Sequence, residues 1–183
     1  MNRFLALFVL TVLASAAAPA MAEKADADKP TNLSAEQASY DDVKQVTTLT
    51  GEALITRGTL IMKAERVTMV EDAAGYQHTT SYAAPGKLAT FRQKRDGGAD
   101  LWIEGEAERI EYDSKTEVAK LFSHAKMRRL EGTRPTDEVE GEFISYDSRT
   151  EFVAVNNTPT GESKTGGGRI KMVIQPRNAG APK

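Results

Sequence analysis

The sequence has no cysteine, few aromatic side chains and no long apolar run beyond its first residues. Without thiols the chain can form neither disulfides nor thiolate metal sites, which excludes zinc fingers, iron-sulfur clusters and cysteine catalysis. A formal net charge of −2 lacks the strong basic excess that is typical of nucleic-acid-binding proteins. Because aromatic residues make up only 7% of the chain, we expect sheet hydrogen bonds and aliphatic burial to stabilise the fold.

The N-terminus has the pattern of a secretory signal peptide. Arg3 gives a positive start, residues 4–18 are apolar or small, and Ala20-Met21-Ala22 supplies the small-x-small pattern of a cleavage site. The apolar stretch is about 15 residues long, whereas a membrane span needs roughly 20. We therefore predict a cleaved signal peptide over residues 1–22 and an exported mature chain. An uncleaved anchor helix is the alternative.

The rest of the chain divides into three parts. Residues 23–30 are charged or small and end in proline, which is typical of a flexible leader. Residues 31–176 carry a continuous structural pattern and are long enough for one domain with its own core. Residues 177–183 predict a disordered tail.

After the leader the pattern is that of β-strands. Short runs of Thr, Val, Ile, Leu and Tyr are separated by Gly, Pro and Asp. Around residue 50, for example, Leu49, Gly51, Ala53 and Ile55 fall on one face of an extended segment. This period of two recurs along the chain and predicts an all-β fold.

The strands are arranged in a repeat. Residues 112–121 match residues 146–155 at most positions by residue type, and each copy opens with Tyr-Asp. A third Tyr-Asp, at Tyr40-Asp41, begins a phrase with the same spacing. Each copy predicts a strand, an Asp-containing turn and a second strand. Since one hairpin cannot bury its apolar face alone, the copies must stack.

Segments rich in glycine, proline and polar residues predict surface loops. They cover residues 73–85, residues 93–100 and residues 156–168. Residues 169–175 then predict a last strand, which Pro176 ends.

No residue pattern indicates catalysis. Carboxylates two positions apart on a strand could form an acid/base pair, and they occur twice, as Glu104 with Glu106 and Glu140 with Glu142. The apolar alternation places both pairs on the solvated face, which favours a structural role. Neither His78 nor His124 has a third ligand at metal spacing. We therefore predict no catalytic residue, no metal site and no cofactor.

The inward faces of the strands allow two interpretations. They could fill an ordinary sandwich core. They could also surround an apolar groove that holds a lipid, as some barrels do. Periodicity alone does not separate these possibilities.

Several phrases of the sequence, in order, resemble a known family. They are residues 49–60, residues 63–67, residues 85–91, the stretch from Glu104-Gly105-Glu106-Ala107 to Tyr112, residues 141–146 and the closing strand. Taken together, from Pro30 to Pro176, they resemble the OstA-like family of periplasmic lipopolysaccharide-transport proteins. The chain departs from the family pattern at Glu52, where the family has asparagine, and at Ser123-His124 in the second copy. The strand register near His124 is therefore open.

The resemblance implies a fold and a function. The fold would be an open, twisted β-jellyroll of antiparallel strands, with a hydrophobic groove that carries the acyl chains of lipid A. The chain would act in the periplasm without catalysis and move lipopolysaccharide from the inner to the outer membrane. Its partners would be lipopolysaccharide, inner-membrane and outer-membrane components of the transport machinery, and further copies of itself, head to tail. The implied groove lining is Leu33, Leu49, Ile55, Leu60, Val67, Met69, Phe91, Ile103, Ile110, Tyr112, Leu121, Ile144 and Tyr146.

Other functions are weighed against this one. An inner-membrane relative would keep an N-terminal span, which Ala20-Met21-Ala22 argues against, and an outer-membrane relative would continue beyond Lys183 into a large barrel. A scaffolding periplasmic protein with a filled core and no lipid is the main alternative. An enzyme acting on envelope glycolipid ranks third.

The two ends of the strand stack predict sites of assembly. An open stack leaves unpaired backbone groups at its first and last strands, and such edges favour pairing with another chain. The closing strand contains Ile170, Met172 and Ile174 with only one internal charge, Lys171. We therefore predict an edge at Thr31 and Leu33 and another at Ile170, Met172 and Ile174. A fold-back of residues 156–168 or of the C-terminal tail over the last strand is the alternative.

Overall fold

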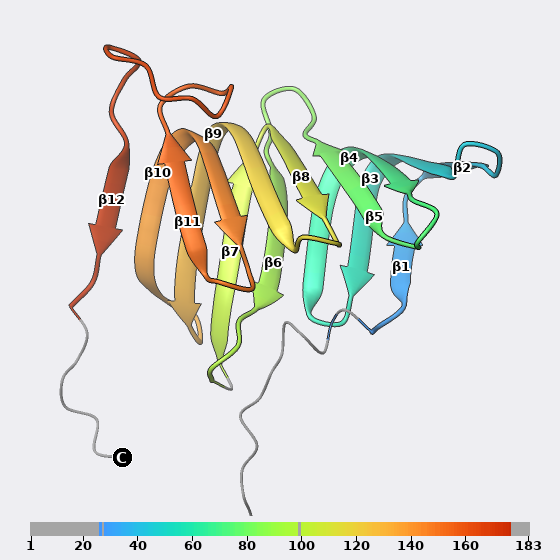
Figure 1. Cartoon of the computed structure of the whole chain (residues 1–183), viewed down its shortest axis with the longest axis horizontal. Helices are drawn as coiled ribbons and strands as arrows, with labels where there is room; N and C mark the ends of the chain where they lie inside the picture. Colours follow the sequence, from blue (N-terminus) through green and yellow to red (C-terminus); the bar gives the residue numbers. More distant parts are fainter. Residues whose placement is uncertain (1–25, 27, 99, 177–183) are drawn as a thin grey trace, which may run out of the picture.

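The computed structural model describes residue 26, residues 28–98 and residues 100–176. The predicted signal peptide over 1–22 and the tail over 177–183 lie outside the described residues. Within the described part the structure contains twelve β-strands (Figure 1): β1 (Thr31–Ser34), β2 (Gln37–Asp41), β3 (Val46–Arg57), β4 (Leu60–Glu71), β5 (Gln77–Tyr82), β6 (Ala89–Lys94), β7 (Leu101–Ala107), β8 (Arg109–Asp113), β9 (Val118–Glu131), β10 (Arg134–Asp147), β11 (Phe152–Asn156) and β12 (Lys171–Ile174). In that part no helix has the length and hydrophobicity needed to span a bilayer.

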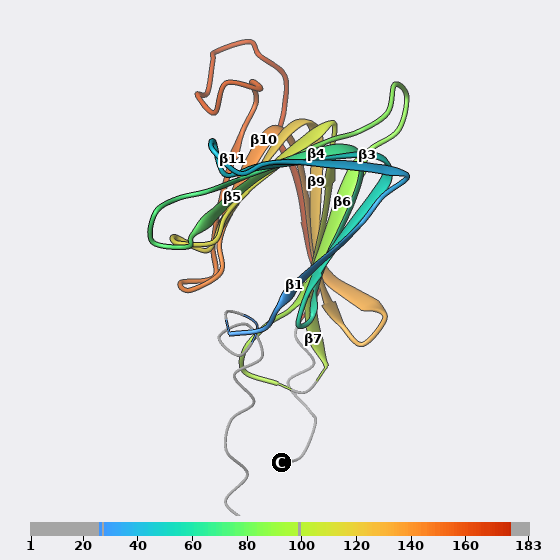
Figure 2. The same cartoon turned by 90° about the vertical axis from the view of Figure 1, so that its right-hand side faces the viewer.

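The strands form one antiparallel sheet that is bent into a V (Figure 2). Four long strands, β3, β4, β9 and β10, pass through the bend and contribute to both sides. The side across the top of Figure 2, here called the upper limb, has the strand order β2-β3-β4-β5-β8-β9-β10-β11. The descending side, the lower limb, has the order β1-β3-β4-β6-β7-β9-β10-β12. The predicted open, twisted β-jellyroll is therefore confirmed.

Bulges produce the bend. In β3 the pairing with β4 shifts between Thr50 and Ala53, and the two residues between them, Gly51 and Glu52, have φ angles of 82° and 45°. In β9 the equivalent residues Ser123 and His124 have φ angles of 62° and 52°. Extra residues of this kind bend a strand and increase its twist. The open register near His124 is thus resolved as a second copy of the bulge in β3.

The Tyr-Asp repeat forms matching turns at the far end of the upper limb. In each copy the aspartate Oδ1 accepts hydrogen bonds from the backbone N–H groups two and three residues later, as in an Asx turn. A left-handed residue, with φ between 53° and 55°, then closes each turn. These aspartates are Asp41, Asp113 and Asp147, and the left-handed residues are Gln45, Glu117 and Glu151.

Two of the predicted loops need correction. Residues 73–85 are not one loop, because β5 (Gln77–Tyr82) lies within them and joins β4 to β8 in the sheet. Its run of Thr and Ser alternates between buried and half-buried positions, so its polarity concealed a strand. The loop predicted from residue 93 begins after Lys94, where β6 ends. The loop after β11 agrees with the prediction.

One residue of the predicted leader packs onto the sheet. Asp26 is only 3% exposed, and its carboxylate accepts hydrogen bonds from the backbone N–H and the hydroxyl of Thr59 at 2.8 and 2.6 Å. Gln93 Nε2 lies 3.4 Å from the same carboxylate. The leader therefore contacts the far end of the lower limb at this point.

Candidate functional site

The residues predicted to line a groove lie mostly in the interior between the limbs. Every predicted lining residue except Leu33 is buried. Leu33, on the edge strand β1, is 37% exposed. The lower limb contributes Ile55, Leu60, Phe91 and Ile103, and the upper limb contributes Leu49, Val67, Met69, Ile110, Tyr112, Leu121, Ile144 and Tyr146. The apolar face of each limb therefore packs against that of the other.

A missing side chain allows the limbs to approach each other closely. A Cβ atom on Gly105 in β7 would lie 2.7 Å from Phe91 Cδ1 and 2.9 Å from Leu121 Cδ2. Those distances are far shorter than a van der Waals contact, so only glycine lets the Phe91 ring lie over β7 and meet the upper limb. Gly105 thus helps to set the spacing of the interior.

The middle of the interior is almost filled. A cavity of about 10 Å³, the space that one water molecule needs, lies between the limbs among Leu60, Phe91, Tyr112 and Tyr146. Gln93, Glu117 and Ser148 reach the same cavity from the open side of the V. Around this cavity the apolar faces cover each other, while a wider pocket of about 210 Å³ opens at the end formed by β11 and β12, where Val153 of the upper limb faces Met127, Val139, Met172 and Ile174 of the lower limb.

Sequence reasoning missed some buried positions. Thr79 and Ser81 on β5 are buried, and so are Ala89 and Val139. The usable signal was Thr79, Thr80 and Tyr82, because threonine and tyrosine are enriched in strands. Ala89 and Val139 lie near a loop and in a charged strand, where no periodicity distinguished them.

Polar contacts join the limbs along the open side of the V, here called the mouth. Arg57 Nη2 at the end of β3 donates to the Tyr112 hydroxyl of β8 at 3.1 Å. Arg95 Nη2, just after β6, lies 2.6 Å from Glu151 Oε2 in the turn between β10 and β11. Arg129 Nη2 donates to the backbone carbonyl of Glu151 at 2.8 Å. Three arginines of the lower limb therefore contact the upper limb, one at strand β8 and two at the turn between β10 and β11.

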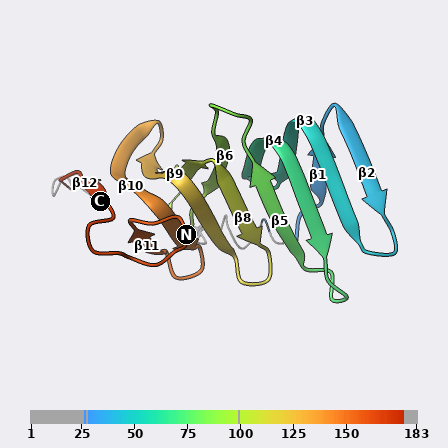
Figure 3. The same cartoon turned by 90° about the horizontal axis from the view of Figure 1, so that it is seen from above.

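The two ends of the sheet carry exposed edge strands (Figure 3). Viewed from above, β2 lies at one end and β12 at the other. β1 and β2 both pair with β3, whereas β11 and β12 both pair with β10. Of the predicted edge residues, Met172 and Ile174 are 59% and 69% exposed, and Ile170 is exposed just before β12. Thr31 lies on β1 with Leu33.

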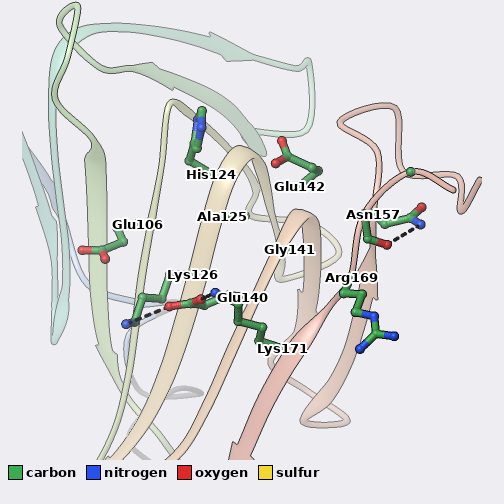
Figure 4. Close-up of a pocket in the computed structure, with 12 residues that line it drawn as sticks. Glu106, His124, Ala125, Lys126, Glu140, Gly141, Glu142, Asn157, Arg169 and Lys171 are labelled. Atoms are coloured by element: carbon green, nitrogen blue, oxygen red, sulfur yellow. Dashed lines mark hydrogen bonds and ion pairs between the residues drawn. The ribbon is translucent and has the colours of Figure 1, made fainter.

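The outer face of the lower limb carries a ladder of ion pairs. Glu104 pairs with Arg92 and with Arg128, and Glu140 pairs with Lys126 and Lys171. A hollow of about 380 Å³ lies beside this ladder, near the vertex (Figure 4). Its labelled side chains are mostly charged or polar, which contrasts with the apolar interior.

The charges in this ladder stabilise one another. Hydrogen bonds to Glu138 and then to Glu140 raise the pKa of Lys126, despite an opposing effect of burial. The hydrogen bond from Lys126 in turn lowers the pKa of Glu140. Such mutual shifts are those of paired surface charges. Each of the two histidines also faces a carboxylate, since His124 Nδ1 lies 2.8 Å from Glu108 and His78 Nδ1 lies 4.0 Å from Asp113.

Comparison with known proteins places the chain in one group. Residues 32–152 match the family model described as LptA/(LptD N-terminal domain) LPS transport protein. The lipopolysaccharide export system protein LptA of Haemophilus influenzae is 29% identical over 171 residues, which cover 93% of this chain and 90% of that protein. LptA of Escherichia coli K12 is 30% identical over 140 residues, which cover 76% of this chain and 71% of that protein.

A solved structure agrees with these matches. It is the crystal structure of LptH, described as the LptA homologous periplasmic component of the conserved lipopolysaccharide transport device from Pseudomonas aeruginosa. The two folds superpose with a TM-score of 0.71 at 27% identity, and the match covers 82% of this chain and 99% of LptH. The bent sheet described above is therefore the fold of a periplasmic transport component, which confirms the predicted location. With the family model matching residues 32–152, this chain belongs to the LptA/(LptD N-terminal domain) LPS transport protein family.

Proposed function

We propose that the chain binds lipopolysaccharide in the periplasm and carries it from the inner toward the outer membrane, with the acyl chains between the two limbs. The observation that carries this proposal is the interior itself, where both limbs present continuous apolar faces to each other. The chain would act by binding rather than by catalysis. The relatives are lipopolysaccharide export proteins, and one carboxylate of each pair, Glu104 and Glu140, is engaged by cations.

Because the middle of the interior is nearly filled, the limbs must separate there to admit a lipid. Burial of an acyl chain contributes about 0.8 kcal/mol per methylene, so a chain of roughly a dozen methylenes contributes about 10 kcal/mol. That value is similar to the whole stability of a typical domain, about 5–15 kcal/mol. A bound acyl chain can therefore replace the limb-to-limb contacts that it displaces.

The small cavity also favours a second candidate, a scaffolding protein whose core stays filled. The two functions differ in what the inward residues contact. A photo-reactive residue at position 55, 91 or 112 should crosslink to lipopolysaccharide if the interior holds acyl chains, because Ile55, Phe91 and Tyr112 are buried between the limbs. The same residue at Glu52 or Glu106, on the outside, is the matched control.

The crosslinking result separates the candidates directly. Lipid adducts at the inward positions alone support lipid binding. Adducts at neither set support a filled core, and this result together with the absence of lipid in the mass spectrum of the purified protein would rule out the proposal. Equal labelling of both sets would mean that lipid coats the surface without entering the interior.

We also infer that copies of the chain, or related jellyrolls, join head to tail into a bridge. This inference is supported by the two ends, which are unlike and exposed: β1 and β2 at one end, β11 and β12 at the other. Because the two surfaces differ, such contacts need not close into a ring. An added strand would extend both limbs and continue the apolar interior.

The assembly model is tested at β12. Truncation before Arg169, or the double substitution of Met172 and Ile174 by proline, removes this edge strand and should reduce self-association in sedimentation. Substitution of Val43 by serine, in the turn between β2 and β3, is the control, since it changes a side chain that is 94% exposed and keeps the backbone N–H that donates to Asp41. Unchanged oligomers in the truncated protein would rule out pairing through β12.

A further inference from the structure

The arginines at the mouth have more donors than the structure satisfies. Arg57 and Arg95 each make the contact described above through Nη2, and in both residues Nε is buried without an acceptor. A buried N–H group without a partner costs free energy, so it is uncommon in native proteins. These two donors lie on the same limb, at the same side of the V.

The chemistry of these donors selects a particular class of ligand. A guanidinium group presents a planar fork of N–H donors that matches the oxygens of phosphate or carboxylate, and phosphate offers more acceptor oxygens. Arg95 is only 12% exposed, so water screens its charge less than at an open surface. Phosphate groups at the mouth could accept the hydrogen bonds that Arg57 Nε and Arg95 Nε leave unmade.

An internal carboxylate occupies part of this place. Glu151 pairs with Arg95 and is 39% exposed, and it belongs to a turn with left-handed φ that Arg129 holds by its backbone carbonyl. The other acidic groups nearby have their own contacts: Glu117 accepts from Ser148, and Asp137 lies 3.8 Å from Arg129. Glu151 is therefore the group that an incoming anion would displace.

We propose that Arg57 and Arg95 form a subsite for the phosphate groups of an amphiphile whose acyl chains lie between the limbs, and that Glu151 occupies the Arg95 side of this subsite until the limbs part. The inference rests on the proposed function, since acyl chains in the interior bring the polar headgroup to the mouth. When the lipid enters, Arg95 separates from Glu151, and the phosphate replaces the carboxylate.

The experiment compares two forms of one lipid. Diphosphorylated lipid A and the same lipid A after removal of both phosphates are titrated against the mature protein, and the ratio of the two dissociation constants is measured. The wild-type protein should bind the phosphorylated form about tenfold more tightly or better, as expected for charge-assisted hydrogen bonds. The double variant Arg57→Gln/Arg95→Gln should bring this ratio close to one while dephosphorylated lipid still binds.

Two further variants make the result specific. Arg128→Gln removes an arginine from the outer face, where it pairs with Glu104 at 3.4 Å, and should keep the wild-type ratio. Glu151→Gln frees Arg95 and should raise the ratio severalfold, an increase that a misfolded variant would not give.

The outcomes distinguish the subsite from the proposed function. Equal binding of both lipids by the wild-type protein, or an unchanged ratio in the double variant or in Glu151→Gln, would overturn the subsite and leave lipid binding intact. Failure of the wild-type protein to bind either lipid would overturn the proposed function, and the subsite with it.

Discussion

At the vertex the limbs share continuous backbone, whereas at the mouth side chains join them. β3, β4, β9 and β10 run through the vertex, and further backbone hydrogen bonds cross it, from Glu108 to Ser123 at 3.1 Å and from Ala83 to Glu108 at 2.9 Å. In the described residues, the backbone hydrogen bonds beside the mouth stay within one limb. Opening at the vertex would break sheet ladders, while opening at the mouth would break a few polar side-chain contacts and separate the apolar faces. Any separation of the limbs would therefore hinge at the vertex.

The largest expected effect on the free energy of unfolding comes from a substitution in the interior between the limbs. Phe91→Ala should lower the free energy of unfolding by about 3–5 kcal/mol, because it removes a buried ring and leaves a cavity. Denaturation in urea measures the loss. If lipid fills the interior, excess lipopolysaccharide should restore more stability to this variant than to the wild type. A loss below about 1 kcal/mol would mean that the limbs collapse freely around the gap.

The packing of Phe91 across the interior can also be tested at Gly105, over which the ring lies. Gly105→Ala should cost about 1–3 kcal/mol, since the new Cβ would press on Phe91 and Leu121. In the Phe91→Ala background the same change should cost much less, because the ring that it meets is gone. Equal costs in the two backgrounds, measured by the same urea titration, would show that Gly105 does not set the spacing of the limbs.

At the vertex the two bulges use different residues in one conformation. Gly51 has φ 82°, and a Cβ there would lie 2.8 Å from Glu36 Cβ, so Gly51→Ala should cost about 1 kcal/mol or more. Ser123 has φ 62°, so Ser123→Gly should be neutral or should stabilise by up to about 1 kcal/mol. Thermal unfolding of both variants checks this. If Gly51→Ala stabilised the protein or Ser123→Gly destabilised it, the two bulges would not share one left-handed conformation.

The side-chain contacts at the mouth should contribute less to the free energy of unfolding than the backbone at the vertex. Glu151→Gln should change the free energy of unfolding by less than about 1 kcal/mol, since Glu151 is 39% exposed and its charge is screened. It should nevertheless widen the separation of the limbs. Because the chain has no cysteine, spin labels at single introduced cysteines in the turns 147–151 and 96–98 can report this distance. A matched pair across the vertex should not change.

The sequence predicted the buried residues of the interior better than the bend at the vertex or the contacts at the mouth. Residues such as Leu49, Ile55 and Ile144 could be assigned because burial on one face imposes a period of two along a strand. The Tyr-Asp turns could be assigned because an aspartate caps them locally. The bend could not, since it depends on two left-handed residues, Ser123 and His124, whose types do not require that conformation.

The contacts at the mouth were also beyond the sequence. Arg57 and Tyr112 are 55 positions apart, and Arg95 and Glu151 are 56 positions apart. Pairing over such separations depends on the register of several intervening strands, and β5 among them was taken for a loop. If one strand is missed, the expected positions of all later turns in the sheet are wrong. These contacts were therefore found only in the folded structure.

The smallest expected effect concerns the turns of the upper limb beside the mouth. The backbone N–H of Thr116 holds the pKa of Asp113 below its ordinary value, with further hydrogen bonds from Thr116 and Lys115. A carboxylate whose pKa is lowered in the folded state contributes stability above its unfolded pKa, near 4, and loses it as the pH falls through the folded value. At about pH 5, Asp113→Asn should therefore be less stable than the wild type by no more than about 1 kcal/mol, and the difference should shrink toward about pH 3. The neighbouring His78 also lowers the pKa of Asp113. Urea titrations at several pH values measure the difference, and Lys120→Gln on the neighbouring β9 is a control outside the turn.

A difference that stays constant with pH would mean that the substitution at position 113 disturbs the turn geometry rather than removing a charge. The turns beside the mouth would then be stabilised by their backbone geometry and not by the charge of the aspartate.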